Sequence, residues 1–193
     1  VSNLVTIPQQ IELADILAEV AGIESKVFFN NSGAEAVETA LKLARLYGHS
    51  KNIDVPKILV MDGAFHGRTI ATIFAGASAK AQHGFEPEMQ GFVRVKYNDP
   101  QAIEAAAKSD KDIVAVLVEP IQGESGVNPP AADYLNKVRE ICDRYKLLMM
   151  IDEVQAGMGR TGQFFCFQHN KIQPDAIMLA KGLANGLPIG ACI

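Results

Sequence analysis

The stretch Leu147-Leu148-Met149-Met150-Ile151-Asp152 joins five apolar residues in a row to a single acid. A run that is apolar at every position is typical of a parallel strand that is covered on both faces. Helical patterns alternate with such runs, which predicts βαβ units and an α/β fold: a mostly parallel central sheet with helices on both faces. Three further runs of this kind lead into polar residues: Lys57 to Met61 before Asp62, Ile113 to Val118 before Glu119, and Asp175 to Leu179 before Lys181.

The predicted helices have their own sequence signals. Asp99-Pro100 supplies an N-cap and a first-turn proline, and Ser32-Gly33-Ala34-Glu35, after a short strand at Lys26 to Asn30, has the spacing of a capping box. Ligands of open α/β sheets bind beyond the carboxyl ends of the strands, so the polar strand-end residues should face one crevice. Apolar stripes lie at Ile11, Ala14, Leu17, Ala18 and Ala21, at Val37, Ala40, Leu41 and Ala44, and at Tyr134, Val138, Ile141 and Tyr145.

Composition narrows the class of protein. The 193 residues suffice for one domain, and a net charge of −4 with interspersed signs argues against nucleic-acid binding and a polybasic membrane segment. No apolar run approaches the length of a membrane span. The three widely spaced cysteines favour a reducing, cytoplasmic compartment, and the four histidines show no metal-ligand spacing.

Two short motifs suggest nucleotide binding and are weak. Gly157 to Gly162 matches G-x-G-x-x-G, but the segment does not directly follow a strand and no helical stripe follows it. The segment Leu147 to Glu153, an apolar strand that ends in two acids, resembles the magnesium-binding strand of a P-loop ATPase. The sequence contains no G-x-x-x-x-G-K-[ST], however, which such an ATPase needs. A P-loop ATPase remains an alternative from another class.

A combination of three features is more informative than any one of them. Asn31-Ser32-Gly33-Ala34 places backbone N–H groups at a helix N-terminus, where the helix dipole favours a phosphate. Asp152 and Lys181 add one carboxylate and one amine to the same predicted crevice. A phosphorylated pyridine aldehyde needs this set of groups.

Five motifs follow one another along the chain: Phe28-Phe29-Asn30-Asn31-Ser32-Gly33-Ala34-Glu35-Ala36, Phe65-His66-Gly67-Arg68-Thr69, Val118-Glu119-Pro120-Ile121-Gln122-Gly123-Glu124, Ile151-Asp152-Glu153-Val154-Gln155-Ala156-Gly157 and Leu179-Ala180-Lys181-Gly182. In this order they resemble the class III aminotransferases, whose members share the fold type I large domain. The resemblance covers the whole chain but about half of the family's usual length, so we expect an amino-terminal segment and a small carboxyl-terminal domain to lie outside residues 1–193.

The resemblance implies the cofactor pyridoxal 5′-phosphate (PLP) and a role for each matching residue. Lys181 would bond covalently to the aldehyde of PLP and transfer a proton as base and acid. Asp152 would pair with the pyridine nitrogen. Val154 and Phe65 would pack on the two faces of the ring, and Gln155 would reach its phenolic oxygen.

The resemblance also implies how phosphate and substrates bind. The phosphate would lie on Ser32, Gly33 and Ala34. Arg68 would bind a substrate carboxylate with two parallel hydrogen bonds. Glu124 matches an acid that pairs with an arginine outside this chain when one substrate is bound and releases it for the other.

The implied reaction moves an amino group from N-acetylornithine to 2-oxoglutarate in arginine biosynthesis, catalysed by a cytoplasmic homodimer. Ornithine, 4-aminobutyrate and succinyl-diaminopimelate are the alternative donors, and a noncatalytic scaffold with this fold is the third class. Because a phosphate-binding threonine and the distal arginine of the family lie outside this chain, we expect the isolated chain to have little or no activity.

Overall fold

The computed structural model describes residues 4–193, so the first three residues of the predicted single domain lie outside the described part. The helices are α1 (Pro8–Ala21), α2 (Gly33–Ser50), α3 (Ile70–Ala75), α4 (Ala79–Gln82), α5 (Pro100–Ser109) and α6 (Tyr134–Tyr145), with the 3-10 helices η1 (Cys166–Asn170) and η2 (Lys181–Leu183). The strands are β1 (Phe28–Asn30), β2 (Lys57–Met61), β3 (Phe92–Val95), β4 (Ile113–Val118), β5 (Leu148–Asp152), β6 (Ala176–Leu179) and β7 (Gly190–Cys192).

Within the described residues, the strands form one sheet of seven in the order β1-β7-β6-β5-β4-β2-β3. Neighbours from β6 to β3 are parallel, whereas β7 is antiparallel to both β6 and β1. The predicted mostly parallel sheet is therefore confirmed. The predicted strands at 57–61 and 113–118 are matched at both ends, β5 and β6 each begin one residue later than predicted, and β3 and β7 were not predicted.

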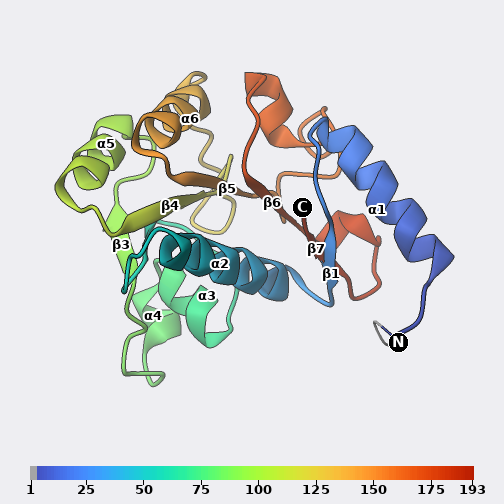
Figure 1. Cartoon of the computed structure of the whole chain (residues 1–193), viewed down its shortest axis with the longest axis horizontal. Helices are drawn as coiled ribbons and strands as arrows, with labels where there is room; N and C mark the ends of the chain where they lie inside the picture. The colour runs from blue at the N-terminus through green and yellow to red at the C-terminus, as the bar shows by residue number, and fades with distance from the viewer. Residues whose placement is uncertain (1–3) are drawn as a thin grey trace.

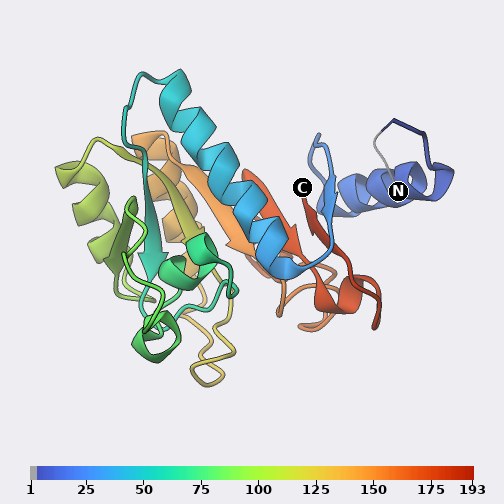
Figure 2. The same cartoon turned by 90° about the horizontal axis from the view of Figure 1, so that it is seen from below.

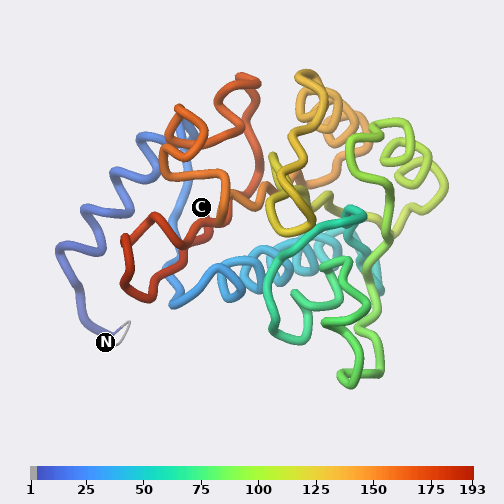
Figure 3. Tube along the Cα trace, turned by 180° about the vertical axis from the view of Figure 1, so that it is seen from behind, coloured from blue at the N-terminus to red at the C-terminus, as the bar shows by residue number. Residues whose placement is uncertain are grey.

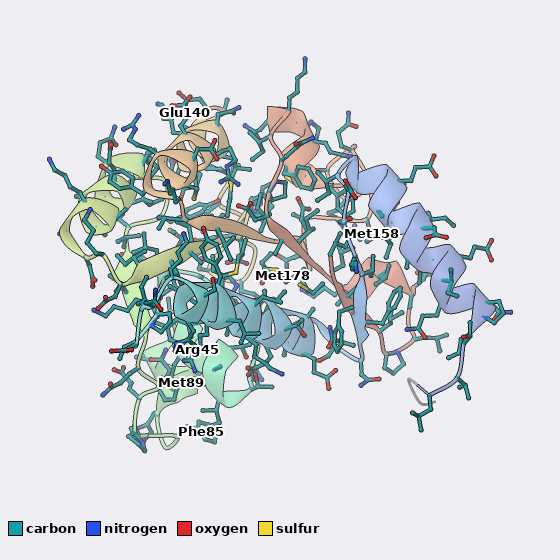
Figure 4. All side chains as sticks on the ribbon, in the orientation of Figure 1. Arg45, Phe85, Met89, Glu140, Met158 and Met178 are labelled. Atoms are coloured by element: carbon teal, nitrogen blue, oxygen red, sulfur yellow. The ribbon has the colours of Figure 1, made fainter. Side chains whose placement is uncertain are left out.

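Helices cover both faces of the sheet, as Figure 1 shows, with α2 and α3 on one face and α5 and α6 on the other. Side chains of one strand alternate between the two layers: Leu59 packs in the cluster formed with α1, α5 and α6, whereas Val60 packs in the cluster formed with α2 and α3. Met178 of β6, labelled in Figure 4, belongs to the α2 cluster. The sheet is therefore a buried middle layer.

Local sequence explains where the helices begin. Asp99 Oδ1 accepts a hydrogen bond from the Ala102 N–H at 3.0 Å, so the predicted N-cap of α5 is confirmed. The predicted inner face of α1 is only partly correct, because Leu17 and Ala21 are buried whereas Ile11 is 51% exposed. The amino-terminal half of α1 extends beyond the sheet edge, where less of the protein is available to cover it (Figure 1).

The connections that follow β4, β5 and β6 gather on one side of the sheet. Figure 2 shows the amino end of α2 on this same side, and Figure 3 shows these connections from behind. This is the side that the strand-end acids and Lys181 were predicted to share. Within residues 4–193, no helix has both the length and the apolar character needed to cross a membrane.

Candidate active site

A cavity of about 310 Å³ lies where β5 and β6 end and α2 begins. It has the size of a small-molecule site. His66 and Glu119 also line it; Glu119 was expected there as a strand-end acid, whereas no role was predicted for His66. The predicted site residues that line it are Ser32, Gly33, Ala34, Phe65, Glu124, Asp152, Val154, Gln155 and Lys181.

The amino end of α2 forms one wall. Ser32 is the N-cap, and its Oγ accepts a hydrogen bond from the Glu35 N–H at 3.2 Å. Glu35 Oε2 in turn accepts from the Asn31 N–H at 2.6 Å, one residue earlier than in a regular capping box. The first N–H groups of a helix have no partner inside it, so this capped end presents donors to an anion.

Small residues allow the helix end to approach the strands closely. A Cβ on Gly33 would lie 2.9 Å from Val154 Cγ1 and 3.3 Å from Ala180 Cβ. A Cβ on Gly190 of β7 would lie 2.2 Å from the Ser32 carbonyl oxygen. Larger side chains at these glycines would push the amino end of α2 away from the strand ends.

Asp152 is the last residue of β5, and it is 5% exposed. Its Oδ2 lies 2.8 Å from His66 Nδ1, and its Oδ1 accepts a hydrogen bond from the Val154 N–H at 3.0 Å. Each carboxylate oxygen thus has one nitrogen partner and keeps further lone pairs. Two such partners hold the carboxylate in a fixed orientation at the cavity wall.

Glu119 follows β4 and is 6% exposed. Its Oε2 accepts a hydrogen bond from the Phe65 N–H at 3.1 Å, which ties the connection after β2 to the end of β4. Burial raises the pKa of Glu119 from 4.5 to about 7, and nearby Asp152 adds to the rise, while His66, the Phe65 N–H and Lys181 oppose it. The cavity therefore contains an acid that can be neutral near pH 7.

Lys181 begins η2 and is separated from the end of β6 by Ala180; its backbone φ is 46°. This left-handed conformation is unfavourable for a residue with a side chain, and such strain is often found at functional sites. The Lys181 side chain is exposed and lines the cavity. The amine of Lys181 is thus accessible from the cavity, while the backbone of this residue is held at the start of η2.

Phe65 and Val154 supply apolar surface to the cavity, and Gln155 supplies an amide. Gln155 Nε2 lies 3.5 Å from Glu124 Oε1, so these two predicted residues are neighbours. A Cβ at position 123 would lie 1.3 Å from Gln155 Oε1. Gly123 therefore leaves the room in which the Gln155 amide lies.

Arg68 is exposed and does not line the cavity, so its assignment to a substrate carboxylate stays a prediction. Its neighbour Thr69 contacts Glu38 of α2 through its hydroxyl and donates its N–H to Thr72 Oγ1 at 3.0 Å. These contacts anchor the start of α3 beside α2.

The GxGxxG segment does not form a nucleotide-binding turn. Residues 157–163 consist of turns and bends, and the short helix that follows later is η1 rather than a helix that begins at Gly162. Among the described residues there is also no group of three or more histidine, cysteine or acidic side chains placed to hold a metal ion.

Comparisons with known proteins agree with this geometry. The acetylornithine aminotransferase of Nitrosomonas europaea is 55% identical over 192 residues, which cover 100% of this chain and 49% of that protein. The crystal structure of N-acetylornithine aminotransferase from Stenotrophomonas maltophilia K279a matches with a TM-score of 0.84 and 36% identity, covering 100% of this chain and 47% of the other.

An ornithine aminotransferase from Toxoplasma gondii, whose structure reveals partial occupancy of PLP at the active site, matches with a TM-score of 0.95 and 34% identity. That match covers 100% of this chain and 46% of the other. The chain spans about half the length of the curated relatives it matches. The family model for aminotransferase class-III matches residues 1–193, and the chain belongs to this family.

Proposed function

We propose that this chain is the cofactor-binding part of a PLP-dependent aminotransferase that moves an amino group from N-acetylornithine to 2-oxoglutarate. The observation that carries the proposal is one cavity that joins the amino end of α2, Asp152 and Lys181. Anion binding, a fixed carboxylate and an accessible amine are the three requirements of a phosphorylated pyridine aldehyde.

The residues present fit PLP. The capped end of α2 would hold the phosphate, since its first N–H groups lack helix partners and Gly33 lets the helix end lie against Val154. Asp152 would hold the pyridine nitrogen, because its two nitrogen partners leave lone pairs available. Phe65 and Val154 would supply the apolar surface that a flat ring needs, and Gln155 would supply a donor for its phenolic oxygen.

When bound, PLP supplies an electron-withdrawing ring that stabilises negative charge on the substrate carbon. The chain's own residues orient groups and move the proton. The negative charge of Asp152 favours a proton on the ring nitrogen. Lys181 Nζ would accept the proton from the substrate α-carbon as a base and give it back as an acid. Phe65 and Val154 would limit the access of water to this part of the cavity.

The proposed donor is N-acetylornithine, since the curated relatives that bear the name acetylornithine aminotransferase are 45–55% identical to the chain. With this donor, the protein would act in arginine biosynthesis. The proposed location is the cytoplasm. Arg68 would bind a substrate carboxylate, and Glu124, next to Gln155 at the cavity wall, would change partners between the two substrates.

We also propose that the whole protein is a homodimer whose sites lie beside the subunit contact. Leu187 lines the cavity and is 75% exposed, and Val127, in the connection after β4, is 81% exposed. A second subunit would cover these apolar side chains. Sedimentation of the intact protein tests this proposal: a dimer is expected, and an active monomer would contradict it.

The substrate is tested with the intact protein that contains this chain, supplied with PLP and 2-oxoglutarate. Glutamate formation is followed with N-acetylornithine, ornithine, 4-aminobutyrate or succinyl-diaminopimelate as the donor. The highest kcat/KM is expected with N-acetylornithine. A higher value with another donor would reassign the substrate, and no glutamate from any donor would reject the activity.

A further inference from the structure

The connection between β4 and α6 carries Glu124 to the cavity. Figure 2 shows it as the yellow loop that projects from the sheet. Residues 124–129 form its exposed tip, yet Glu124 also lines the cavity and lies beside Gln155. An exposed tip has little packing of its own to fix it, so the position of Glu124 depends on what holds the rest of this connection.

The base of the tip is a short two-stranded bridge. Gln122 and Asn128 exchange two backbone hydrogen bonds, with N···O distances of 3.3 and 2.8 Å. The Gln122 side chain is buried, and its Nε2 donates to the Asp62 carbonyl oxygen at 2.7 Å. The bridge makes the tip one unit, which moves with the segments on either side of it.

Both of these segments are held by the connection between β3 and α5. The Tyr97 hydroxyl is shared between the carbonyl oxygens of Glu119 and Pro120, at 3.1 and 3.2 Å, before the tip. Asn98 Oδ1 accepts a hydrogen bond from the Ala131 N–H at 2.9 Å, after the tip. Two adjacent residues thus hold the chain on both sides of the tip.

The local structure suits both residues to this role. The ring of Tyr97 packs edge-on against that of Tyr134, with 5.3 Å between the ring centroids, which fixes the direction of its hydroxyl. Burial raises the pKa of Tyr97, so this hydroxyl keeps its proton and stays a donor around neutral pH. Asn98 has a backbone φ of 59°, which asparagine tolerates better than most residues do. The turn after β3 therefore directs both side chains at the connection after β4.

We propose that Tyr97 and Asn98 are positioning residues, which hold the connection between β4 and α6 so that Glu124 stays at the cavity and sets the preference between the two substrates. This inference rests on the proposed function, in which Glu124 changes partners between the amino donor and 2-oxoglutarate. Neither Tyr97 nor Asn98 lines the cavity, so each acts through the loop rather than by contact with a substrate. Loss of either contact lets the tip move, which changes the two substrate affinities unequally.

Variants of the intact protein remove the two contacts one at a time. Tyr97→Phe removes the donor and keeps the ring. Asn98→Gly keeps a backbone that tolerates a positive φ and removes the acceptor, whereas Asn98→Asp retains an acceptor. The matched controls lie outside the cavity: Tyr47→Phe, whose hydroxyl donates to the Lys146 carbonyl oxygen, and Asn52→Gly, at a residue with a φ of 60°.

The first measurement is backbone amide exchange of the cofactor-free protein, followed by mass spectrometry. Peptides from residues 119–133 should exchange about 2- to 12-fold faster in Tyr97→Phe and in Asn98→Gly, as for the loss of one ordinary hydrogen bond. Peptides of α2 and β5 should follow the parent, as should Asn98→Asp and both controls throughout. Unchanged exchange of residues 119–133 in both variants would overturn the proposal.

The second measurement is the ratio of kcat/KM for N-acetylornithine to kcat/KM for 2-oxoglutarate. This ratio should change about 2- to 12-fold in Tyr97→Phe and in Asn98→Gly, while the dissociation constant of PLP stays within about twofold of the parent. In a Glu124→Ala background the same substitutions should change the ratio by less than about twofold, because the side chain that they position is gone. A parent-like ratio in both variants, or an undiminished change in that background, would overturn the proposal.

Failure of the proposed function is recognised separately, because the parent would then form no glutamate from any donor. The amide exchange still decides in that case whether Tyr97 and Asn98 hold the connection between β4 and α6.

Discussion

Asp152 and Glu153 are adjacent acids at the end of β5, they are 5% and 1% exposed, and their surroundings differ completely. Asp152 lines the cavity and is held by His66 and the Val154 N–H. Glu153 does not line the cavity, and its two oxygens accept hydrogen bonds from the N–H groups of Cys166 and Phe167 at 3.0 and 2.9 Å. Asp152 therefore faces the cavity, whereas Glu153 anchors the start of η1.

This difference shows that burial and a raised pKa do not by themselves mark a functional acid. Burial raises the pKa of Glu153 to about 7, as it does for Glu119 at the cavity, although within residues 4–193 the hydrogen bonds of the Glu153 carboxylate come from backbone N–H groups alone. The group that each carboxyl faces decides its role. A substitution of Asp152 should therefore change catalysis, whereas a substitution of Glu153 should change the free energy of unfolding.

The largest expected effect is on catalysis by Asp152→Asn. The amide has the shape of the carboxylate but lacks its charge, so kcat/KM should fall about 10²- to 10³-fold, as when one preorganised electrostatic group is removed. A variant that retains more than about a tenth of the parent's kcat/KM would contradict the role assigned to this acid.

The second effect is the pH dependence of stability due to Glu119. The Glu119 carboxyl has a pKa of 4.5 in the unfolded state and of about 7 in the folded state. The contribution to stability is therefore fully present below about pH 4.5 and is lost as the pH rises to about 7, on the order of 3 kcal/mol in total. Denaturant unfolding of Glu119→Gln without cofactor should show a smaller decline over this range.

The control for this measurement is Glu140→Gln, because Glu140 lies exposed on the surface of α6, as labelled in Figure 4. It should follow the parent at every pH. A decline in Glu119→Gln as steep as that of the parent would show that another group causes the pH dependence.

The third effect concerns stability alone. At pH 8 both oxygens of Glu153 accept an N–H, and in Glu153→Gln an NH₂ group would face one of these donors. The unfolding free energy should fall by about 1–3 kcal/mol, whereas KM for both substrates should stay unchanged in the folded protein. Chemical denaturation and steady-state kinetics at pH 8 would measure this, and a KM shift with full stability would reverse the assignments of the two acids.

The smallest effect is expected for Gly123→Ala. The added Cβ would overlap Gln155 Oε1, so the amide must move away from its present position. Because the overlap is with the end of a flexible side chain, stability should change little. PLP affinity should weaken about 2- to 12-fold, as for one ordinary hydrogen bond. Titration of Gly123→Ala with PLP would measure this, and unchanged affinity would argue against a contact between Gln155 and the cofactor.

The sequence predicted the parts of the fold that local pattern controls. The fully apolar runs became buried central strands, and Ser32 and Asp99 became N-caps. β3 and β7 were missed because they are short, and β3 includes Arg94, whose side chain donates to the Phe74 and Gly76 carbonyl oxygens at the end of α3. That polar contact between distant segments leaves no periodic signal.

The site was predicted less completely than the fold. Nine of the residues that the family motifs predicted for the site line the cavity, whereas Arg68 lies outside it. The sequence analysis assigned no role to His66, since its contact with Asp152 depends on the order of the strands, which the sequence does not specify. Glu119 was expected at the crevice from its position at the end of a fully apolar strand, and it lines the cavity.

The most direct test of the account is to identify the lysine that binds PLP. The intact protein is mixed with PLP, reduced with borohydride, digested and mapped by mass spectrometry, with Lys181→Ala treated in parallel. We predict one dominant phosphopyridoxyl group, on Lys181, and no comparable label in the variant. A label on another lysine, or equal labelling of the variant, would contradict the convergence of α2, Asp152 and Lys181 on one cofactor.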